Sequence, residues 1–277
     1  IILGHGVKNS KSEDLIKKII LDYKIPVSLT WPMTDFLDSN HFLNTGRPGV
    51  VAKRSANLII QKSDFILSLG SRLDRIVTAF NPSNFGRNAK YFYTIDIDKN
   101  ELNKFPGRFK KIRSDIKDFI MYFSKKSPKT NAKSRSDWLD EICDIKNKYG
   151  GIPIQKKTKK LTSYQVVNSL SDLIPEKSKI VTGSSGLCIE VFYTHFKNKN
   201  GQRIFLTTGL GAMGYGLPAL LGTCAKYSKE KVFLYESDGS LMMNLQELQT
   251  LKTYKYNATI FVMNNKGYAS IRSTQNN

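Results

Sequence analysis

Residues 232–240 read Val232-Phe233-Leu234-Tyr235-Glu236-Ser237-Asp238-Gly239-Ser240. Four apolar or aromatic residues followed by polar residues and a glycine predict a buried strand that ends in a sharp turn. A helical pattern follows over residues 245–254, and a second apolar run follows over residues 259–263. A β-α-β unit with uninterrupted apolar strands is typical of a parallel sheet that is covered on both faces.

The same alternation of apolar runs and helical periodicity extends over most of the chain. In the first part, it predicts strands at residues 1–4, 26–30, 65–70 and 91–96 and helices at 13–24 and 54–62. In the second part, it predicts strands at residues 179–182, 203–207, 232–235 and 259–263 and helices at 164–173, 214–227 and 245–254. We therefore predict an α/β fold with two doubly wound parallel-sheet domains joined by a basic linker.

The linker is predicted from a change in composition. Lysine clusters at Lys125-Lys126 and Lys156-Lys157-Thr158-Lys159-Lys160 flank one amphipathic segment, residues 138–149. This pattern indicates a surface helix within a polar connection. The predicted division is a domain at residues 1–123, a linker with a surface helix at 124–160 and a domain at 161–277.

The composition of the 277 residues disfavours wholesale disorder, because 40% are hydrophobic and 11% aromatic. Lys and Arg number 43 against 23 Asp and Glu, which gives a net charge of +20. This surplus is spread over linker and helix faces without a zinc-finger, RNA-recognition or helix-turn-helix signature, so we expect no nucleic-acid partner. A surface of this sign would still attract anionic ligands such as phosphates.

Several other classes are disfavoured by simple patterns. No run approaches the roughly 20 apolar residues that span a bilayer, and the first residues lack a signal-peptide pattern, so we expect no membrane partner and a cytoplasmic location. Three cysteines without a Cys-x-x-Cys pair and three separated histidines argue against a disulfide framework or a zinc site. The chain opens inside a predicted strand, and residues 273–277 show no closing helix, so we expect it to be part of a longer polypeptide.

Asp238, Gly239 and Ser240 form the most informative cluster. A strand that delivers these residues into a helix N-terminus suits a diphosphate, because the glycine permits close approach and backbone amides and the serine hydroxyl can donate hydrogen bonds. The Asp238 carboxylate would repel that anion unless a divalent cation lay between them. Mg²⁺ prefers oxygen ligands, and the Asn265 amide and the Gly267 carbonyl follow the next predicted strand. We therefore predict a Mg²⁺ site at Asp238, Asn265 and Gly267.

This cluster resembles the thiamine-diphosphate motif, in which Gly-Asp-Gly is followed at a fixed interval by Asn-Asn. Asn265 follows Asp238 by 27 residues, which is enough for one helix and the next strand. Ser237 stands where the motif has its first glycine, so the sequence leaves the geometry of this turn open. The alternative is a β-α-β unit with an incidental turn.

A second stretch, residues 207–218, resembles the segment of the same family that holds the aminopyrimidine ring of the cofactor. The resemblance implies that the Gly211 carbonyl accepts a hydrogen bond from that ring and that Met213 supports the bent cofactor from beneath. Together the two stretches assign cofactor binding to the following residues: Ser184, Ser185, Gly211, Ala212, Met213, Asp238, Gly239, Ser240, Asn265, Gly267 and Tyr268.

Motifs of the first part occur in the order seen in the central domain of acetolactate-synthase-like enzymes. They include Leu3-Gly4-His5-Gly6-Val7, Gly70-Ser71-Arg72-Leu73-Asp74 and Asp96-Ile97-Asp98. In the family members that bind FAD, such segments line the nucleotide, which implies FAD contacts at Gly4, His5, Gly6, Gly70, Ser71, Arg72, Asp96 and Asp98. Other members keep the same sheet without flavin, and Gly4-His5-Gly6 is not a complete Gly-x-Gly-x-x-Gly pattern, so both options stay open.

The resemblance implies a thiamine-diphosphate- and Mg²⁺-dependent transferase of the acetolactate synthase and pyruvate decarboxylase family. In these terms, residues 1–123 are the central domain and residues 161–277 are the diphosphate-binding domain, truncated at its C-terminus. We expect a carboligase that acts on a small 2-oxo acid such as pyruvate. A 2-oxo acid decarboxylase is the alternative, and a nicotinamide or flavin dehydrogenase is less favoured.

In this family, a glutamate in an N-terminal pyrimidine-binding domain of the partner subunit assists deprotonation of the cofactor. The chain shows no counterpart of that domain, so we assign no catalytic residue and expect the chain to be inactive alone. Family members place the cofactor between two subunits, which implies a homodimer or homotetramer for the intact protein. Two departures bear on the substrate: Ser184-Ser185 replaces Gln-His of acetolactate synthases, and Tyr268-Ala269-Ser270-Ile271-Arg272 replaces a Glu-rich continuation.

Overall fold

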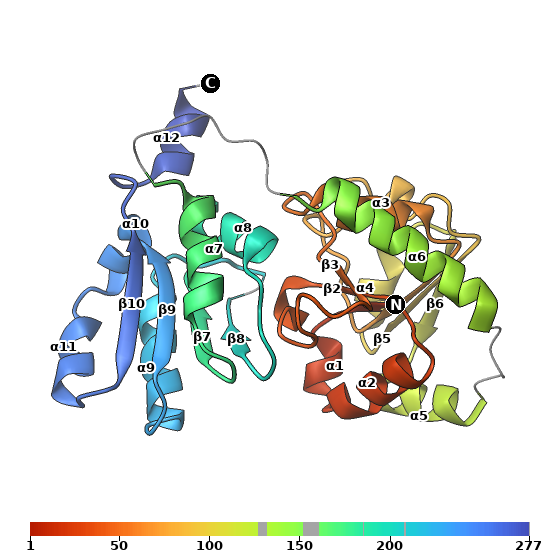
Figure 1. Cartoon of the computed structure of the whole chain (residues 1–277), viewed down its shortest axis with the longest axis horizontal. Coiled ribbons are helices and arrows are strands. Elements are labelled where there is room, and N and C mark those ends of the chain that lie inside the picture. The colour runs from red at the N-terminus through yellow and green to blue at the C-terminus, as the bar shows by residue number, and fades with distance from the viewer. Residues whose placement is uncertain (127–131, 152–160, 185, 208, 277) are drawn as a thin grey trace. The chain divides into compact units, whose positions relative to one another are not determined.

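The computed structural model describes residues 1–126, 132–151, 161–184, 186–207 and 209–276. The chain forms two compact units, Ile1–Pro153 and Ile154–Asn277. Each unit is a parallel sheet with helices on both faces (Figure 1). The predicted α/β class with two doubly wound parallel sheets is therefore confirmed.

The first unit contains a six-stranded parallel sheet with the order β3-β2-β1-β4-β5-β6. Its strands are β1 (Ile2–Leu3), β2 (Val27–Leu29), β3 (Asn44–Gly46), β4 (Phe65–Leu69), β5 (Tyr91–Asp96) and β6 (Phe109–Arg113). The direction in which strands are added reverses between β1 and β4. The loops that follow these two strands therefore form the switch point of the sheet, where α/β proteins often bind ligands.

Helices bury apolar side chains against both faces of this sheet. They are α1 (Gly6–Asn9), α2 (Glu13–Asp22), α3 (Arg54–Lys62), α4 (Lys99–Asn103), α5 (Ile116–Lys126) and α6 (Ala132–Tyr149), with 3₁₀ turns at Trp31–Met33 and Pro82–Asn84. Ile20 of α2 and Ile120 of α5 share one core with Leu3. Ile60 of α3 shares the other core with Ile2. Neighbouring residues of β1 thus serve opposite faces, as the two-residue period of a strand requires.

Helix α6 contains the surface helix predicted at residues 138–149, but it is longer and belongs to the first unit. Ile142 and Ile145 of α6 are buried with Ile59 of α3. The guanidinium carbon of Arg54 lies 4.9 Å from the centre of the Tyr149 ring. The apolar stripe of this helix therefore packs on α3 and does not stand free in a linker. The lysine cluster at residues 156–160 lies outside the described residues.

The second unit contains a four-stranded parallel sheet with the order β10-β9-β7-β8. Its strands are β7 (Lys179–Thr182), β8 (Arg203–Phe205), β9 (Val232–Ser237) and β10 (Ala258–Met263). Its switch point lies between β7 and β9. Strand β9 pairs with β10 along its full length, and Ser237 lies opposite Met263. The residues that follow both strands therefore emerge together at one edge of the sheet.

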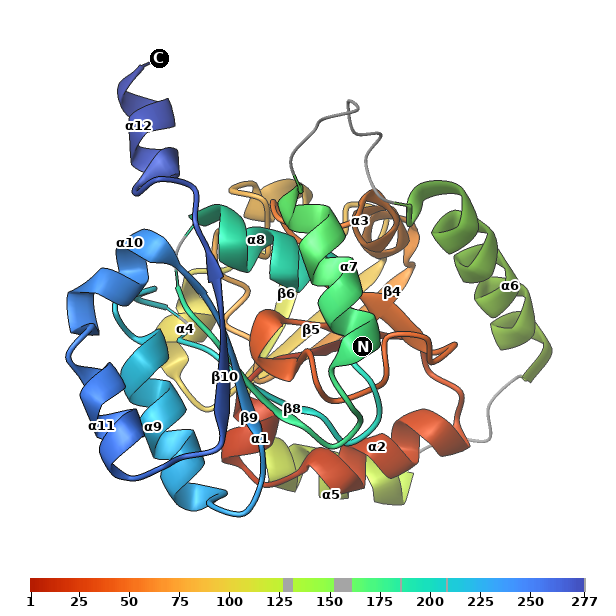
Figure 2. The same ribbon diagram turned by 60° about the vertical axis from the view of Figure 1, so that its left-hand side comes forward.

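The helices of the second unit are α7 (Ser163–Leu173), α8 (Gly186–His195), α9 (Gly216–Lys226), α10 (Asp238–Leu241), α11 (Glu247–Thr253) and α12 (Ala269–Gln275), with a 3₁₀ turn at Met242–Asn244. Helices α9 and α11 lie on one face of the sheet and α7 and α8 on the other (Figure 2). Leu217 and Leu220 of α9 are buried with Leu234 of β9. The expectation of no closing helix is wrong, because α12 occupies part of residues 273–277. No helix within the described ranges combines the length and apolar character needed to cross a membrane.

Three glycines allow two loops of the first unit to touch through their backbones. The Gly4 amide donates to the Leu69 carbonyl at 2.9 Å, and the Gly6 amide donates to the Gly70 carbonyl at 3.0 Å. A Cβ atom on Gly4 would lie 2.3 Å from both the Gly70 oxygen and the Ser71 Cα. Such contacts are far inside van der Waals distance, so no side chain fits between β1 and β4 at this edge.

We expect the substitution Gly4→Ala to lower the free energy of unfolding of the first unit by about 2–4 kcal/mol, because backbone must move to admit the methyl group. Gly107→Ala is the matched control, since nothing lies within 4 Å of a Cβ at that position. It should change stability by no more than about 0.5 kcal/mol. Urea unfolding of both variants measures the difference, and equal losses would contradict the packing role of Gly4.

Candidate functional site

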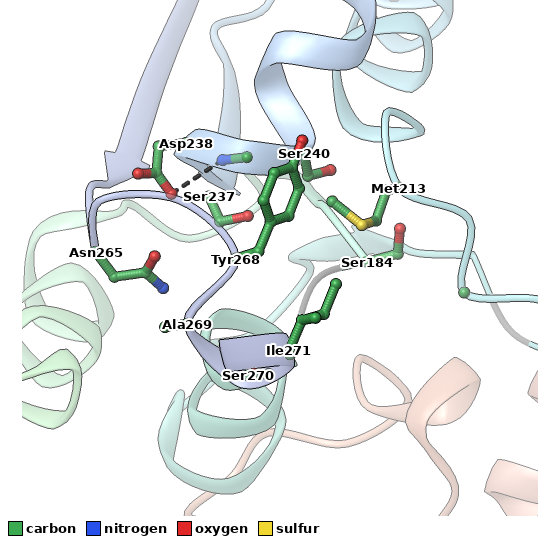
Figure 3. A pocket seen from close by; sticks show the side chains of 13 residues that line it. Ser184, Met213, Ser237, Asp238, Ser240, Asn265, Tyr268, Ala269, Ser270 and Ile271 are labelled. Carbon is green, nitrogen blue, oxygen red and sulfur yellow. Dashed lines mark hydrogen bonds between the residues drawn. The ribbon is translucent and has the colours of Figure 1, made fainter. Parts of the chain in front are cut away.

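A pocket of about 260 Å³ lies at the carboxyl edge of the second sheet. It is bordered by the loops that follow β7, β9 and β10 and by the segment before α9 (Figure 3). Of the residues predicted to bind the cofactor, eight line this pocket: Ser184, Gly211, Met213, Asp238, Gly239, Ser240, Asn265 and Tyr268. The fold thus brings together segments that are about 80 residues apart in the sequence.

Asp238 lies directly after β9 and is held by two backbone amides. The Gly239 amide donates to Oδ1 at 2.9 Å, and the Gly267 amide donates to Oδ2 at 2.7 Å. The second hydrogen bond joins the turn after β9 to the loop after β10. A carboxylate has about four acceptor positions, so each oxygen of Asp238 keeps capacity for a further partner.

The loop after β10 has an unusual backbone. Lys266 and Gly267 both adopt positive φ angles, 63° and 80°. The Arg272 guanidinium of α12 donates to the Lys266 carbonyl at 2.8 Å and to the Asn265 carbonyl at 3.2 Å. A positive φ angle is unfavourable for a lysine. The turn directs the Gly267 amide at Asp238, and Asn265 lies beside Asp238 at the end of the neighbouring strand (Figure 3).

The donor set at this edge suits a hard divalent cation in combination with an anionic ligand. Among the described residues, no three His, Cys, Asp or Glu side chains converge on one point. A cation at Asp238 would therefore take its other ligands from amide, carbonyl, water and phosphate oxygens. Mg²⁺ commonly binds through one or two carboxylates with substrate phosphates and water, so the residues present fit this ion.

Ser237, which stands where the thiamine-diphosphate motif has a glycine, causes no strain. Its φ and ψ are −101° and 157°, an extended conformation that any L-residue adopts. The turn geometry that the sequence left open is thus compatible with serine. Helix α10, which follows, has only four residues, so its dipole would contribute little to the binding of an anion. The polar groups of the turn would provide most of the electrostatic stabilisation.

The segment before α9 is tied to the turn after β9. The Gly214 amide donates to the Ser240 hydroxyl at 2.9 Å, and the Asn244 side chain donates to the Gly214 carbonyl at 2.8 Å. Ser240 is fully buried. Its oxygen therefore has a protein partner, besides the phosphate contact predicted for it.

The wall opposite Asp238 combines a thioether and a serine. Met213 points into the pocket, and Ser184 lies near it at the end of β7 (Figure 3). The Ser184 hydroxyl donates to the Ala212 carbonyl. Gly211 has a φ of 60° and open space where a Cβ would be. Ser184 and Ala212 thus bind each other in this structure, and Ser185 lies outside the described residues.

Sequence reasoning missed two features of the site. Ser270 and Ile271 of α12 line the pocket, and the sequence indicated no helix there. Glu236 of β9 is 1% exposed. Burial raises the pKa of its carboxyl group, against the lowering influence of the Ser237 amide, the Ser240 hydroxyl and the Gly216 amide. A lone acidic residue at the end of an apolar strand was the signal that could have singled it out.

The residues predicted to contact FAD lie at the switch point of the first unit. Gly4, Gly6 and Gly70 pack against each other. The Gly4 and Gly6 amides donate to the Leu69 and Gly70 carbonyls at the end of β4. His5 lies between these glycines, and Ser71 is buried beside them. The glycines of this turn therefore let the loops after β1 and β4 pack against each other through their backbones.

The charged residues of this group lie at the rim of the same edge. Arg72 Nη2 lies 3.0 Å from Glu101 Oε1, and the Arg72 side chain is 68% exposed. Asp96 accepts the Asp98 amide at 3.0 Å, and Asp98 accepts the Asn100 amide at 2.8 Å as the cap of α4. These carboxylates therefore accept hydrogen bonds from backbone amides of their own turns. Arg72 is the group of this set that could meet a phosphate, after release from Glu101.

Comparison with known proteins gives matches over both units. The family described as "Thiamine pyrophosphate enzyme, central domain" matches residues 1–122, and "Thiamine pyrophosphate enzyme, C-terminal TPP binding domain" matches residues 184–277. The second match contains every described residue of the pocket after β7.

Individual relatives agree with these matches. The acetolactate synthase isozyme 1 large subunit of Escherichia coli K12 is 29% identical over 278 residues, which cover 99% of this chain and 47% of the relative. The acetolactate synthase large subunit of Lactococcus lactis is 27% identical over 99% of this chain and 47% of its own length. A probable acetolactate synthase large subunit of Methanococcus aeolicus is 29% identical over 100% of this chain and 48% of its own length.

The chain spans about half the length of the curated relatives it matches. The match to the central domain covers the six-stranded sheet, and the match to the TPP-binding domain covers the Asp238 pocket and most of the four-stranded sheet. This chain belongs to the thiamine pyrophosphate enzyme family and carries regions that match its central domain and its C-terminal TPP-binding domain.

Proposed function

We propose that this chain is part of a thiamine-diphosphate- and Mg²⁺-dependent carboligase that acts on a small 2-oxo acid such as pyruvate. The observation that carries the proposal is the position of Asp238 and Asn265 side by side at the ends of β9 and β10, in a pocket that also contains Met213. The functional division proposed with it is a central domain at residues 1–123 and a cofactor domain at 161–277. The intact protein would act as a homodimer or homotetramer.

The proposed roles follow from the chemistry of each group. Asp238 and the Asn265 amide oxygen would bind Mg²⁺, and the Gly267 carbonyl would be the third protein ligand. The amides around Gly239 and the Ser184 hydroxyl would bind diphosphate oxygens once the Ser184 bond to Ala212 opens. Met213 and Gly211 would hold the aminopyrimidine ring, with Tyr268 beside Gly239. When bound, thiamine diphosphate supplies an electron sink for the carbon atom next to the 2-oxo acid carboxylate.

Carboligation is preferred over simple decarboxylation because the relatives described above are named acetolactate synthases. The residues that depart from those enzymes, Ser184 and Tyr268 among them, line the pocket where a substrate would approach the cofactor. A 2-oxo acid decarboxylase therefore stays the alternative. A nicotinamide dehydrogenase is less favoured, since Gly4-His5-Gly6 is not a complete Gly-x-Gly-x-x-Gly pattern.

Asp238→Ala tests the metal site. We expect the wild-type chain to bind thiamine diphosphate in the presence of Mg²⁺, and we expect this substitution to reduce the Mg²⁺-dependent affinity by at least ~10-fold, because a charged ligand is lost. Isothermal titration calorimetry with Mg²⁺ and with excess EDTA measures the metal-dependent part. Asp172→Ala, an exposed aspartate of α7, is the matched control. Unchanged Mg²⁺-dependent affinity in Asp238→Ala would remove the proposed ligand.

Met213→Ala separates recognition of the ring from recognition of the diphosphate. We expect about a 5- to 30-fold loss of affinity for thiamine diphosphate, because an apolar contact of roughly 1–2 kcal/mol disappears. Affinity for inorganic diphosphate should stay the same, since Met213 offers no group to an anion. Met121→Ala, an exposed methionine of α5, is the control. Equal losses for both ligands would contradict the ring-supporting role.

Flavin binding by the first unit is a separate proposal, and Arg72 is its test. We expect the chain to quench FAD fluorescence saturably, and Glu101→Gln to raise the FAD affinity about two- to fivefold by releasing Arg72 from an exposed ion pair. Glu141→Gln breaks the exposed Lys62 pair elsewhere in the unit and serves as control. Absence of quenching, or no gain in Glu101→Gln, would argue for a member of the family without flavin.

A further inference from the structure

Glu236 is a buried acidic residue that none of the roles proposed above uses. It occupies the penultimate position of β9, two residues before Asp238, and is 1% exposed. Burial of a carboxyl group costs free energy unless hydrogen bonds or an opposite charge compensate for lost hydration. Its presence at this depth therefore calls for a physical reason.

Three segments of the second unit meet at this carboxyl group. A Cβ atom on Gly183 would lie 1.9 Å from Glu236 Oε1, and a Cβ atom on Gly216 would lie 2.1 Å from Oε2. The Ser237 amide donates to Oε1 at 2.9 Å. A side chain at residue 183 or 216 would have to displace the Glu236 carboxyl group, so this group occupies the space between the end of β7, the start of α9 and the turn after β9.

Each of these segments continues directly into a wall of the pocket. Gly183 precedes Ser184, and Gly216 follows the segment that contains Gly211 and Met213. Ser237 precedes Asp238. The Ser240 hydroxyl, which accepts the Gly214 amide, adds a second link between the last two segments. A change in the size or polarity of the group at position 236 would therefore shift several walls relative to one another.

We propose that Glu236 is a positioning residue of the cofactor site, whose carboxyl group sets the spacing between the Ser184 loop, the Met213 segment and the Asp238 turn. This inference rests on the proposed function. Glu236 itself touches neither cofactor nor metal in this proposal. It acts by filling a fixed volume and by accepting the Ser237 amide, so that Asp238 faces Asn265.

The test uses the full chain and the probes thiamine diphosphate and Mg²⁺. Glu236→Met fills a similar volume without an oxygen acceptor, and Glu236→Gln keeps both the volume and an acceptor for the Ser237 amide. We expect the Mg²⁺ concentration for half-maximal binding to rise at least ~10-fold in Glu236→Met, the effect of losing one buried hydrogen bond, and to stay within about threefold in Glu236→Gln. Glu230→Gln, an exposed glutamate paired with Lys179, should behave as wild type.

Thermal unfolding without ligand separates positioning from general stability. A merely structural role would lower the melting temperature of Glu236→Met and leave its Mg²⁺ requirement unchanged at temperatures where it is folded. That result would overturn the inference. Should Glu236→Met not fold, Glu236→Asp keeps the carboxyl group but shortens its reach, and wild-type binding by this variant would equally overturn the inference.

The proposed function and the proposed role of Glu236 are contradicted by different results. If the wild-type chain binds no thiamine diphosphate with Mg²⁺, the proposed function fails and the role of Glu236 fails with it. If wild type binds and Asp238→Ala does not, while Glu236→Met matches wild type, the role of Glu236 alone fails. Rescue in Glu236→Gln together with loss in Glu236→Met supports the positioning role.

Discussion

Parallel pairing of β9 with β10 is the constraint on which the candidate site depends. The register places Ser237 opposite Met263, so both chains leave the sheet at the same level. The hydrogen bond from the Gly267 amide to Asp238 then closes the gap between the two loops at 2.7 Å. Without this register, Asp238 and Asn265, which are 27 residues apart in the sequence, would not lie side by side at one edge of the sheet.

The two units apply the same topological rule with different results. Each sheet has a switch point where loops diverge and a crevice can form at the carboxyl ends of the strands. In the first unit, Gly4, Gly6 and Gly70 let the loops after β1 and β4 touch through their backbones. In the second unit, Gly211 has open space where a Cβ would be, and the Glu236 carboxyl group lies between Gly183 and Gly216. The glycines of the first unit thus bring two loops into contact, whereas Gly183 and Gly216 of the second unit leave room for a buried side chain.

Much of the fold could be predicted from the sequence, because long apolar strands and amphipathic helices carry strong periodic signals. The predicted strand at residues 91–96 and helix at 54–62 match β5 and α3 in both bounds. Elements with weak signals were missed. Strand β3 reads Asn44-Thr45-Gly46, and the edge strand β6 has charged residues at three of its five positions. Strand β6 still buries Phe109 in one core, but its charged residues interrupt the apolar run that would predict a strand.

The sequence by itself determined the family resemblance and the chemical types at the site, since these depend on residue identity and spacing along the chain. Only the tertiary structure decided which groups are available to a ligand. It showed that the Gly4 and Gly6 amides and the Ser184 hydroxyl bind within the protein, that Ser237 adopts an ordinary extended backbone, and that Glu236 is buried between Gly183 and Gly216. Hydrogen-bond partners and packing come from segments far apart in sequence, so local patterns carry no information about them.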